Sequence, residues 1–157
     1  MKTFFFIILL SFSLFAQDSS MTLRSYEFKL GMTTDQVWEN LKPDLNVVED
    51  DAGSLFISDK HDAPVGIIVI KNEKVVKILK DWGTTVKSNV GQVFQTLWKI
   101  FKQYDKELDA VKVVPTETYT PKGDKITLQF YITENRFIDV SIQHSVTIYE
   151  VLEEKEN

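Results

Sequence analysis

The chain has 157 residues, no cysteine and a formal net charge of −5, with 18 Lys and Arg residues against 23 Asp and Glu residues. This balance argues against a nucleic-acid-binding protein, because binding to phosphates needs a concentrated basic footprint. The absence of cysteine excludes a thiol nucleophile, a cysteine-ligated zinc site and a lipid-modified cysteine. The stability of the chain must therefore come from its hydrophobic core rather than from disulfides.

The first 16 residues have the pattern of a cleavable signal peptide. Lys2 precedes a largely apolar run at 4–15, and the small residue Ala16 closes it. This order of charge, apolar segment and small residue is typical of export signals, and the run is shorter than the roughly 20 residues of a membrane-spanning helix. We therefore expect a signal peptide at 1–16 and an exported, soluble domain at 17–157, periplasmic or secreted, with no transmembrane segment after cleavage. An uncleaved N-terminal anchor is the alternative.

The first half of the expected domain begins with a short helix and continues with strands. Residues 26–30 alternate between apolar and charged side chains, which predicts an extended lead-in. Thr33 and Gln36 have the spacing of a capping box at a helix N-terminus, and Pro43 ends the helix that follows. Apolar runs rich in β-branched residues then predict strands at 47–48, 55–57, 65–70 and 75–82.

The second half repeats this order with a longer helix at 89–104. Apolar residues at spacings of three and four predict one continuous buried stripe along it. The stripe consists of Val90, Val93, Phe94, Leu97, Phe101, Tyr104 and Leu108. Trp82 and Trp98 are expected in the core. Four further strands are predicted at 111–119, 126–133, 136–143 and 146–152. The charged residues of these strands, Glu117, Asp139 and Glu150, are expected to face outward.

These elements predict an α+β domain of two helix-plus-four-strand units, at 24–83 and 84–152, with an antiparallel sheet packed on the helices. Residues 36–41 align with residues 92–97 and share Gln, Val and Leu at the same places. Self-similarity of this kind is typical of an internal repeat. Both a duplicated unit and two unrelated segments within one domain fit these observations.

A short motif suggests a family resemblance. Residues 30–41 carry Gly31-Met32-Thr33, followed by Val37 and Leu41. This stretch resembles the opening helix of small bacterial envelope domains of the SmpA/OmlA type, which pack that helix on an antiparallel sheet. The tandem order of helix and four strands also resembles domains of the beta-lactamase-inhibitory-protein type. The chain departs from the lipoprotein pattern, since it lacks the cysteine and has Lys42-Pro43 at the helix end. The resemblance implies a binding or scaffolding domain rather than a catalyst.

One histidine-containing loop is a candidate for chemistry. Asp59, His61 and Asp62 have side chains that could hold a divalent cation, but no second histidine and no calcium-loop spacing accompany them. A solvated connecting loop accounts for the same residues. A metal-dependent or hydrolytic enzyme that uses this loop, with Ser58 as a nucleophile, is one alternative to a binding function, although no nucleophile-elbow motif surrounds Ser58. No phosphate-binding glycine motif is present, and no cofactor is expected.

The candidate binding residues are three tyrosines on predicted second-half strands, Tyr119, Tyr131 and Tyr149. Tyrosine is a frequent anchor of protein interfaces, because it buries a large area at a small cost in side-chain entropy. The alternation of residues 126–133 places Tyr131 on the face opposite the apolar one. We therefore expect a non-enzymatic domain that binds another protein or envelope component through its sheet face. The alternatives are tyrosine rings that only cover the sheet edge, and a small-ligand carrier with a pocket behind Phe94 and Trp98.

Overall fold

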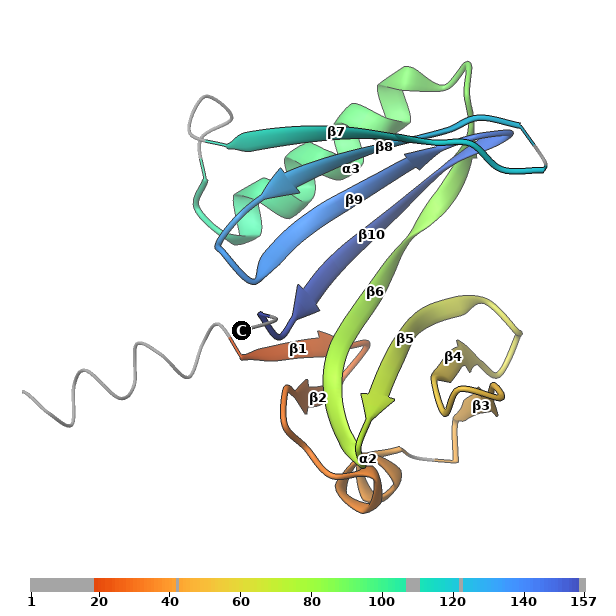
Figure 1. Ribbon diagram of the computed structural model, residues 1–157, viewed down its shortest axis with the longest axis vertical. Coiled ribbons are helices and arrows are strands. Elements are labelled where there is room, and N and C mark those ends of the chain that lie inside the picture. The colour runs from red at the N-terminus through yellow and green to blue at the C-terminus, as the bar shows by residue number, and fades with distance from the viewer. Residues whose placement is uncertain (1–18, 42, 107–110, 122, 156–157) are drawn as a thin grey trace, which may run out of the picture.

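The structure, a computed structural model, describes residues 19–41, 43–106, 111–121 and 123–155 (Figure 1). The predicted signal peptide at 1–16 lies outside these residues. The strands are β1 (Ser20–Leu23), β2 (Tyr26–Lys29), β3 (Leu45–Glu49), β4 (Leu55–Asp59), β5 (Pro64–Lys71), β6 (Lys74–Val86), β7 (Lys112–Thr118), β8 (Lys125–Tyr131), β9 (Arg136–Ile142) and β10 (Ser145–Glu153). The helices are α2 (Thr34–Asn40) and α3 (Val90–Gln103).

Eight strands form one antiparallel sheet in the order β3-β4-β5-β6-β10-β9-β8-β7, and β1 pairs with β2 as a separate hairpin. The prediction of an α+β domain made of two helix-plus-four-strand units is therefore wrong, because the fold is mostly β. Two features explain the difference. The long strand β6 pairs with β10, so the strands merge into one sheet. The predicted lead-in is itself part of a hairpin, and α2 has only seven residues.

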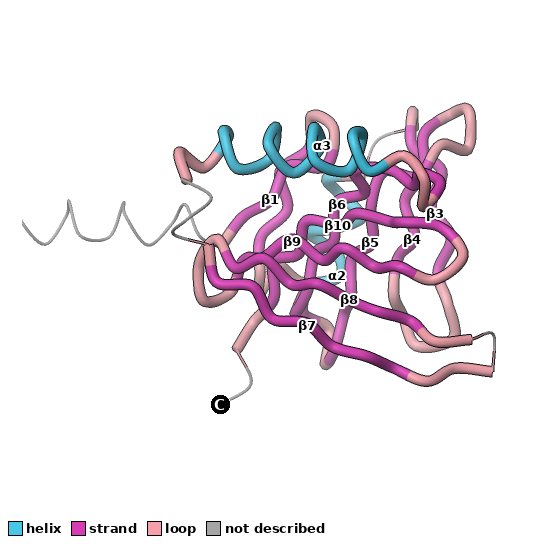
Figure 2. The backbone as a smooth tube through the Cα atoms, turned by 90° about the horizontal axis from the view of Figure 1, so that it is seen from above, coloured by secondary structure: helices cyan, strands magenta, loops and turns pink. Residues whose placement is uncertain are grey.

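Both helices and the β1–β2 hairpin lie on the same face of the eight-stranded sheet, which we call the covered face. Ile78 on β6 lies opposite Leu152 on β10, and both belong to the buried cluster under β1, β2 and α2. Glu150 lies two residues before Leu152 and therefore on the same face of β10. It pairs with Ile138 of β9, which belongs to the buried cluster under α3. Because side chains alternate along a strand, both clusters lie on one face. Figure 2 shows α3 along one side of the sheet.

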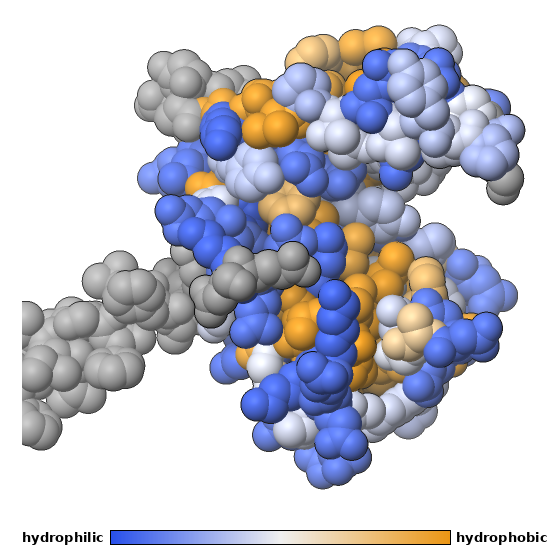
Figure 3. All heavy atoms as spheres, in the orientation of Figure 1, coloured by the Kyte–Doolittle hydropathy of each residue, from blue (hydrophilic) through white to orange (hydrophobic). Residues whose placement is uncertain are grey.

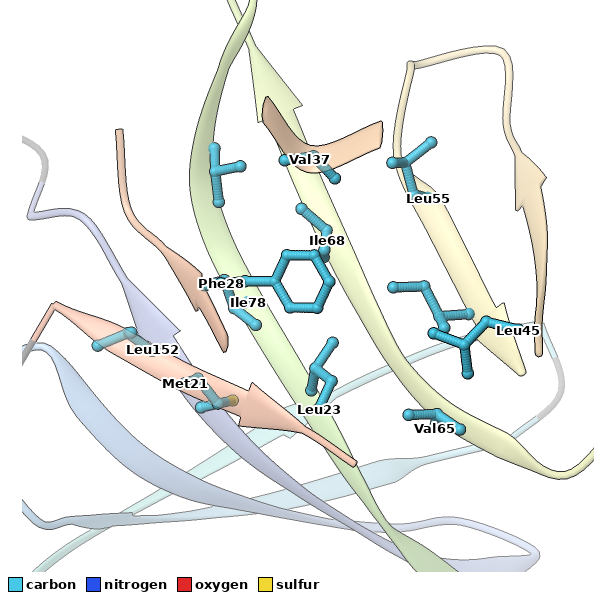
Figure 4. Packing of buried hydrophobic residues seen from close by; sticks show 12 residues of the cluster. Met21, Leu23, Phe28, Val37, Leu45, Leu55, Val65, Ile68, Ile78 and Leu152 are labelled. Carbon is cyan, nitrogen blue, oxygen red and sulfur yellow. The ribbon is translucent and has the colours of Figure 1, made fainter. Parts of the chain in front are cut away.

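The cluster under the hairpin and α2 is closely packed (Figure 4). Phe28 of β2 has no exposed surface and lies among Ile68 and Ile78 of the sheet. Leu23 of β1 packs on Gly66 of β5. A Cβ atom at Gly66 would lie 2.3 Å from a backbone carbonyl oxygen of β6 and 3.0 Å from the Leu23 side chain. Glycine at this position therefore permits the close approach of the β6 backbone and of Leu23 on β1.

Several local signals in the sequence are present where they were predicted. Thr33 and Gln36 form the capping box of α2, with hydrogen bonds of 3.0 and 3.3 Å. Asn89 caps α3 by accepting the backbone N–H of Gln92 at 3.3 Å. The β5–β6 turn places Asn72 and Glu73 at positive φ. None of the helices within the described ranges is long and apolar enough to cross a membrane.

The inner side of α3 packs on the sheet as its periodicity predicts. Leu97 and Phe101 of the predicted stripe are buried, and so is Ile100, which the stripe did not include. The Phe101 ring meets Phe130 of β8 edge-on at a centroid distance of 6.2 Å. Leu108 of the predicted stripe lies outside the described residues. Trp82 of β6 packs partly buried against this cluster, in agreement with its expected place in the core. The inner side of α3 therefore covers the part of the sheet that carries this cluster.

The predicted buried stripe is wrong along one flank of α3. Val90, Phe94 and Trp98 are 53%, 66% and 52% exposed, so Trp98 is not a core residue. Residues four apart advance about 40° around a helix, and these three drift away from the line that faces the sheet. The apolar arc of α3 is therefore wider than the strip of sheet it covers.

The free edges of the sheet are β3 and β7. Pro115 lies in the middle of β7, opposite Leu128 of β8. Proline has no backbone N–H, so it fits a strand ladder where that group would point away from the partner strand. The outward edge of β7 therefore lacks a hydrogen-bond donor at its centre.

Candidate functional site

The face opposite the helices and hairpin, which we call the open face, has no covering element within the described part of the chain. One row of side chains crosses it from edge to edge, with one residue from every strand. We call it the transverse row, and in strand order it is Val48, Phe56, Ile67, Leu79, Val151, Phe137, Tyr131 and Lys112. All but Lys112 are apolar or aromatic, whereas solvent-facing strand positions are ordinarily polar.

The centre of the transverse row is tightly packed without any covering element. Phe137 and Val151 are only 2% and 1% exposed. The Tyr131 ring lies 5.2 Å from the Phe137 ring, and the Lys77 ammonium lies 5.9 Å from the same ring. The Tyr131 hydroxyl donates to Oε1 of Gln129 at 3.1 Å. These contacts fix the Tyr131 ring, so it presents a preformed aromatic surface.

A polar row lies beside the transverse row. Asp81, Tyr149 and Asp139 are neighbours on β6, β10 and β9, and the Tyr149 hydroxyl donates to Asp81. Burial raises the pKa of Asp81, while the 2.6 Å hydrogen bond from the Gly83 N–H opposes the rise. Burial also raises the pKa of Asp139 and that of Tyr149. The row therefore holds two partly dehydrated carboxylates next to the aromatic rings.

Hydroxyl side chains form a third row. It consists of Thr84, Thr147, Ser141, Thr127 and Thr116, on β6, β10, β9, β8 and β7. The Oγ1 atoms of Thr84 and Thr147 lie 3.2 Å apart, within hydrogen-bond distance. Residues of the second and third rows, including Asp139 and Tyr149, line an open depression of about 450 Å³. On strands β6, β10, β9, β8 and β7, the open face is therefore polar on one side of the transverse row.

The structure brings two of the three candidate tyrosines together. Tyr131 and Tyr149 lie on the open face, opposite Phe137 and Asp139, which are two residues apart on β9. Tyr131 faces away from the apolar side of β8, as the alternation of its strand predicts. Tyr119 follows the end of β7, is 78% exposed and lies outside the three rows.

The 59–62 loop uses its carboxylates to close a turn. One oxygen of Asp59 accepts the backbone N–H groups of His61 at 2.8 Å and Ala63 at 3.0 Å, and the other pairs with Arg24. These two backbone hydrogen bonds hold the pKa of Asp59 below its ordinary value. Asp62 adopts a positive φ of 58° in the same turn. The described residues contain no group of three side chains able to hold a metal ion. The turn accounts for both carboxylates without a ligand.

A buried charged network lies on the covered face. Glu150 and Arg136 are 1% and 3% exposed, and Nη1 of Arg136 lies 2.6 Å from Oε1 of Glu150. The Tyr104 hydroxyl donates to Glu150, and the indole N–H of Trp82 donates to the other carboxylate oxygen at 3.2 Å. Arg136 also donates to the backbone carbonyl of Ser20. The prediction that Glu150 faces outward is therefore wrong.

The sequence contained a signal for this network. Glu150 has the same parity on β10 as Val146, Ile148 and Leu152, all of which are buried on the covered face. The charge of Glu150 predicts exposure, but its position in the alternating pattern of β10 predicts burial. Burial, followed by the charge of Glu150, raises the pKa of Tyr104, which keeps its hydroxyl protonated as a donor. Through Tyr104, the C-cap residue of α3, the network joins the helix end to β1, β6, β9 and β10.

The flank of α3 bears on the small-ligand carrier hypothesis. Phe94 and Trp98 are each more than half exposed. They therefore do not line an internal pocket between α3 and the sheet, and this counts against a carrier that uses them.

Comparisons with protein-family models, with curated proteins and with solved structures found no match for this chain. The resemblance of residues 30–41 to envelope domains of the SmpA/OmlA type therefore stays a prediction from the sequence motif.

Proposed function

We propose that this chain is an exported, non-enzymatic domain that binds another protein through the open face of its sheet. The transverse row is the observation that supports the proposal. It carries apolar or aromatic side chains on seven neighbouring strands of a face that the described elements leave uncovered. The exposed apolar members of the row are Val48 and Phe56 at one end, while Tyr131 near the other end is partly buried, and exposed apolar side chains beside polar ones are typical of interaction sites.

The arrangement of the open face matches the anatomy of a protein interface. Interfaces combine an apolar and aromatic centre with a polar rim that supplies hydrogen bonds and excludes wrong partners. Here Tyr131, on the strand next to the β7 edge, packs on the buried Phe137, and Asp81, Asp139 and the hydroxyl row lie to one side of the transverse row. The raised pKa values of the two aspartates reflect partial burial before any partner binds. Donors from a partner would offset that burial, so these residues favour a partner with basic or amide groups.

Tyr131 and Tyr149 are the residues expected to contribute most to binding. Both rings are held before binding, Tyr131 by Phe137 and Gln129, and Tyr149 by its hydrogen bond to Asp81. A side chain that is already ordered loses little entropy when it is buried in an interface. Tyrosines in such positions commonly form the few contacts that dominate affinity.

The expected signal peptide places the partner in the bacterial envelope or outside the cell. The chain, carrying an affinity tag, would be used to capture partners from native envelope extract, and captured proteins would be identified by mass spectrometry. Affinity would then be measured with the purified partner. We expect Tyr131→Ala and Tyr149→Ala each to weaken binding by about tenfold or more, the loss typical of interface anchors.

Tyr119→Ala is the matched control, because Tyr119 is more exposed than either candidate but lies outside the rows. Its affinity should remain within about twofold of wild type, the range of residues that are not anchors. Unfolding curves would confirm that all three variants fold. Unchanged binding by both open-face variants would show that the partner uses another surface.

A further inference from the structure

A second exposed apolar surface lies on the opposite side of the sheet. Val90, Phe94 and Trp98 follow one another at intervals of four residues along α3, and each is more than half exposed. We call them the α3 flank. Val86, just before the helix, is 63% exposed. Figure 3 shows apolar atoms at the surface along the top of the molecule, where Figure 1 places α3.

The α3 flank extends toward the β7 edge of the sheet. Around the helix axis Phe101 lies between Val90 and Phe94. It contacts Phe130 of β8, which fixes the direction in which the flank faces. Near the β7 edge the covered face also carries exposed apolar residues. Val113 of β7 is 46% exposed and Ile126 of β8 is 44% exposed. The helix therefore leaves an apolar strip uncovered rather than one isolated side chain.

The charge around this flank is opposite to that of the whole chain. Residues 84–104 contain Lys87, Lys99 and Lys102 and no acidic residue, although the chain has a net charge of −5. The Lys102 ammonium lies 5.4 Å from the centre of the Trp98 ring. The covered-face positions of β7 and β8 add one acidic residue, Glu117. The surface around α3 thus combines aromatic side chains with an excess of positive charge.

We infer that the α3 flank docks on a lipid bilayer that carries anionic headgroups. Helices that lie in the membrane interface present Trp, Phe and aliphatic side chains beside lysines. Lysine stems can lie along apolar surface while their ammonium groups reach anionic headgroups. The site is independent of the open face, so the chain could hold a protein partner on one side of the sheet and a bilayer on the other.

Charge favours a bilayer over a second copy of the chain. A symmetric dimer would place the same surface on both partners, and would bring Lys102, which lies beside Trp98, close to the same residue of the second copy. Like charges in an interface weaken association. Three exposed side chains also form a small patch compared with the area that a stable dimer buries. Insertion into headgroups, in contrast, uses both the apolar side chains and the lysines.

The test measures binding of the purified chain to phosphatidylcholine vesicles with and without phosphatidylglycerol, at one anionic lipid in roughly three. Wild type should bind the anionic vesicles at least about tenfold more tightly than the neutral ones. The pair Phe94→Ala and Trp98→Ala should lower binding to anionic vesicles by about tenfold or more. Lys102→Gln should lower it by about fivefold and reduce the preference for anionic lipid, because its ammonium lies beside Trp98.

Trp38→Ala is the matched control, because this aromatic side chain is 44% exposed on helix α2, outside both the α3 flank and the transverse row. All variants keep the same N-terminal segment, so any lipid affinity of residues 1–16 cancels in the comparison. Binding by the Phe94→Ala, Trp98→Ala pair equal to that of wild type would overturn the inference. So would equal binding of wild type to neutral and anionic vesicles. If this pair instead changes the molecular mass in sedimentation and leaves vesicle binding intact, the flank is a contact between copies.

Discussion

The two halves of the covered face are closed to different degrees. In the first half, the β1–β2 hairpin and α2 together bury Phe28 and Val37 completely. In the second half, α3 alone covers the sheet and leaves Phe94 and Trp98 more than half exposed. Phe94 and Trp98 belong to neither buried cluster, so the core does not use these side chains. Apolar residues that a core does not use are the ones to examine for binding.

The largest expected effect contrasts two phenylalanines on the covering elements. Phe28→Ala should lower the free energy of unfolding by about 3–5 kcal/mol, because it leaves a cavity in a closed cluster. Phe94→Ala should change it by less than about 0.5 kcal/mol, as is usual for an exposed position. Urea unfolding followed by circular dichroism would measure both. A similar loss in the two variants would mean that the second half is closed as tightly as the first.

The next effect concerns the charged network on the covered face. Glu150→Gln should destabilise the fold by about 3 kcal/mol, because Arg136 would remain buried without a counter-charge. Replacing both residues, as Glu150→Leu with Arg136→Met, should recover part of that loss, since no buried charge remains. The measurement is again urea unfolding. A double variant less stable than Glu150→Gln would show that the hydrogen bonds of the network matter more than its charge balance.

The smallest effect concerns Asp139 on the open face of the second half. Burial raises its pKa above the ordinary value of 3.8 in the folded state. The folded chain therefore holds this proton more tightly, and stability falls as the pH rises from 3.8 through the raised pKa. Asp139→Asn should remove this pH-dependent loss of stability. As the pH rises from 3.8 through the raised pKa, the unfolding free energy of the variant should therefore increase relative to that of wild type. A difference that does not vary with pH would show that Asp139 has an ordinary pKa when folded.

The sequence predicts local structure better than the way in which strands combine. The α2 capping box and the Asn72-Glu73 turn depend on residues close in the chain, and they were identified from spacing alone. The pairing of β6 with β10 brings Asp81 next to Tyr149, far apart in the sequence, and no local pattern specifies it. That pairing makes one sheet out of the two expected units.

Only part of the candidate site can be predicted from the sequence. Alternation along β8 placed Tyr131 on the side away from the core, but the transverse row arises from register between strands, which a single strand does not reveal. The charge of Glu150 predicts exposure and its parity on β10 predicts burial, and the side chain is buried. The exposure of Trp98 differs from the prediction because periodicity identifies the apolar arc of a helix but not how much of that arc a sheet can cover.

Pro115 has a consequence for how copies of this chain behave at high concentration. An uncovered outer strand is a template on which another molecule can add its own strand, and repeated addition leads to fibrils. The missing N–H at the centre of β7 interrupts that template, between Val113 and Glu117. The protein can therefore carry apolar side chains close to this edge without turning the edge into a growth point for aggregates.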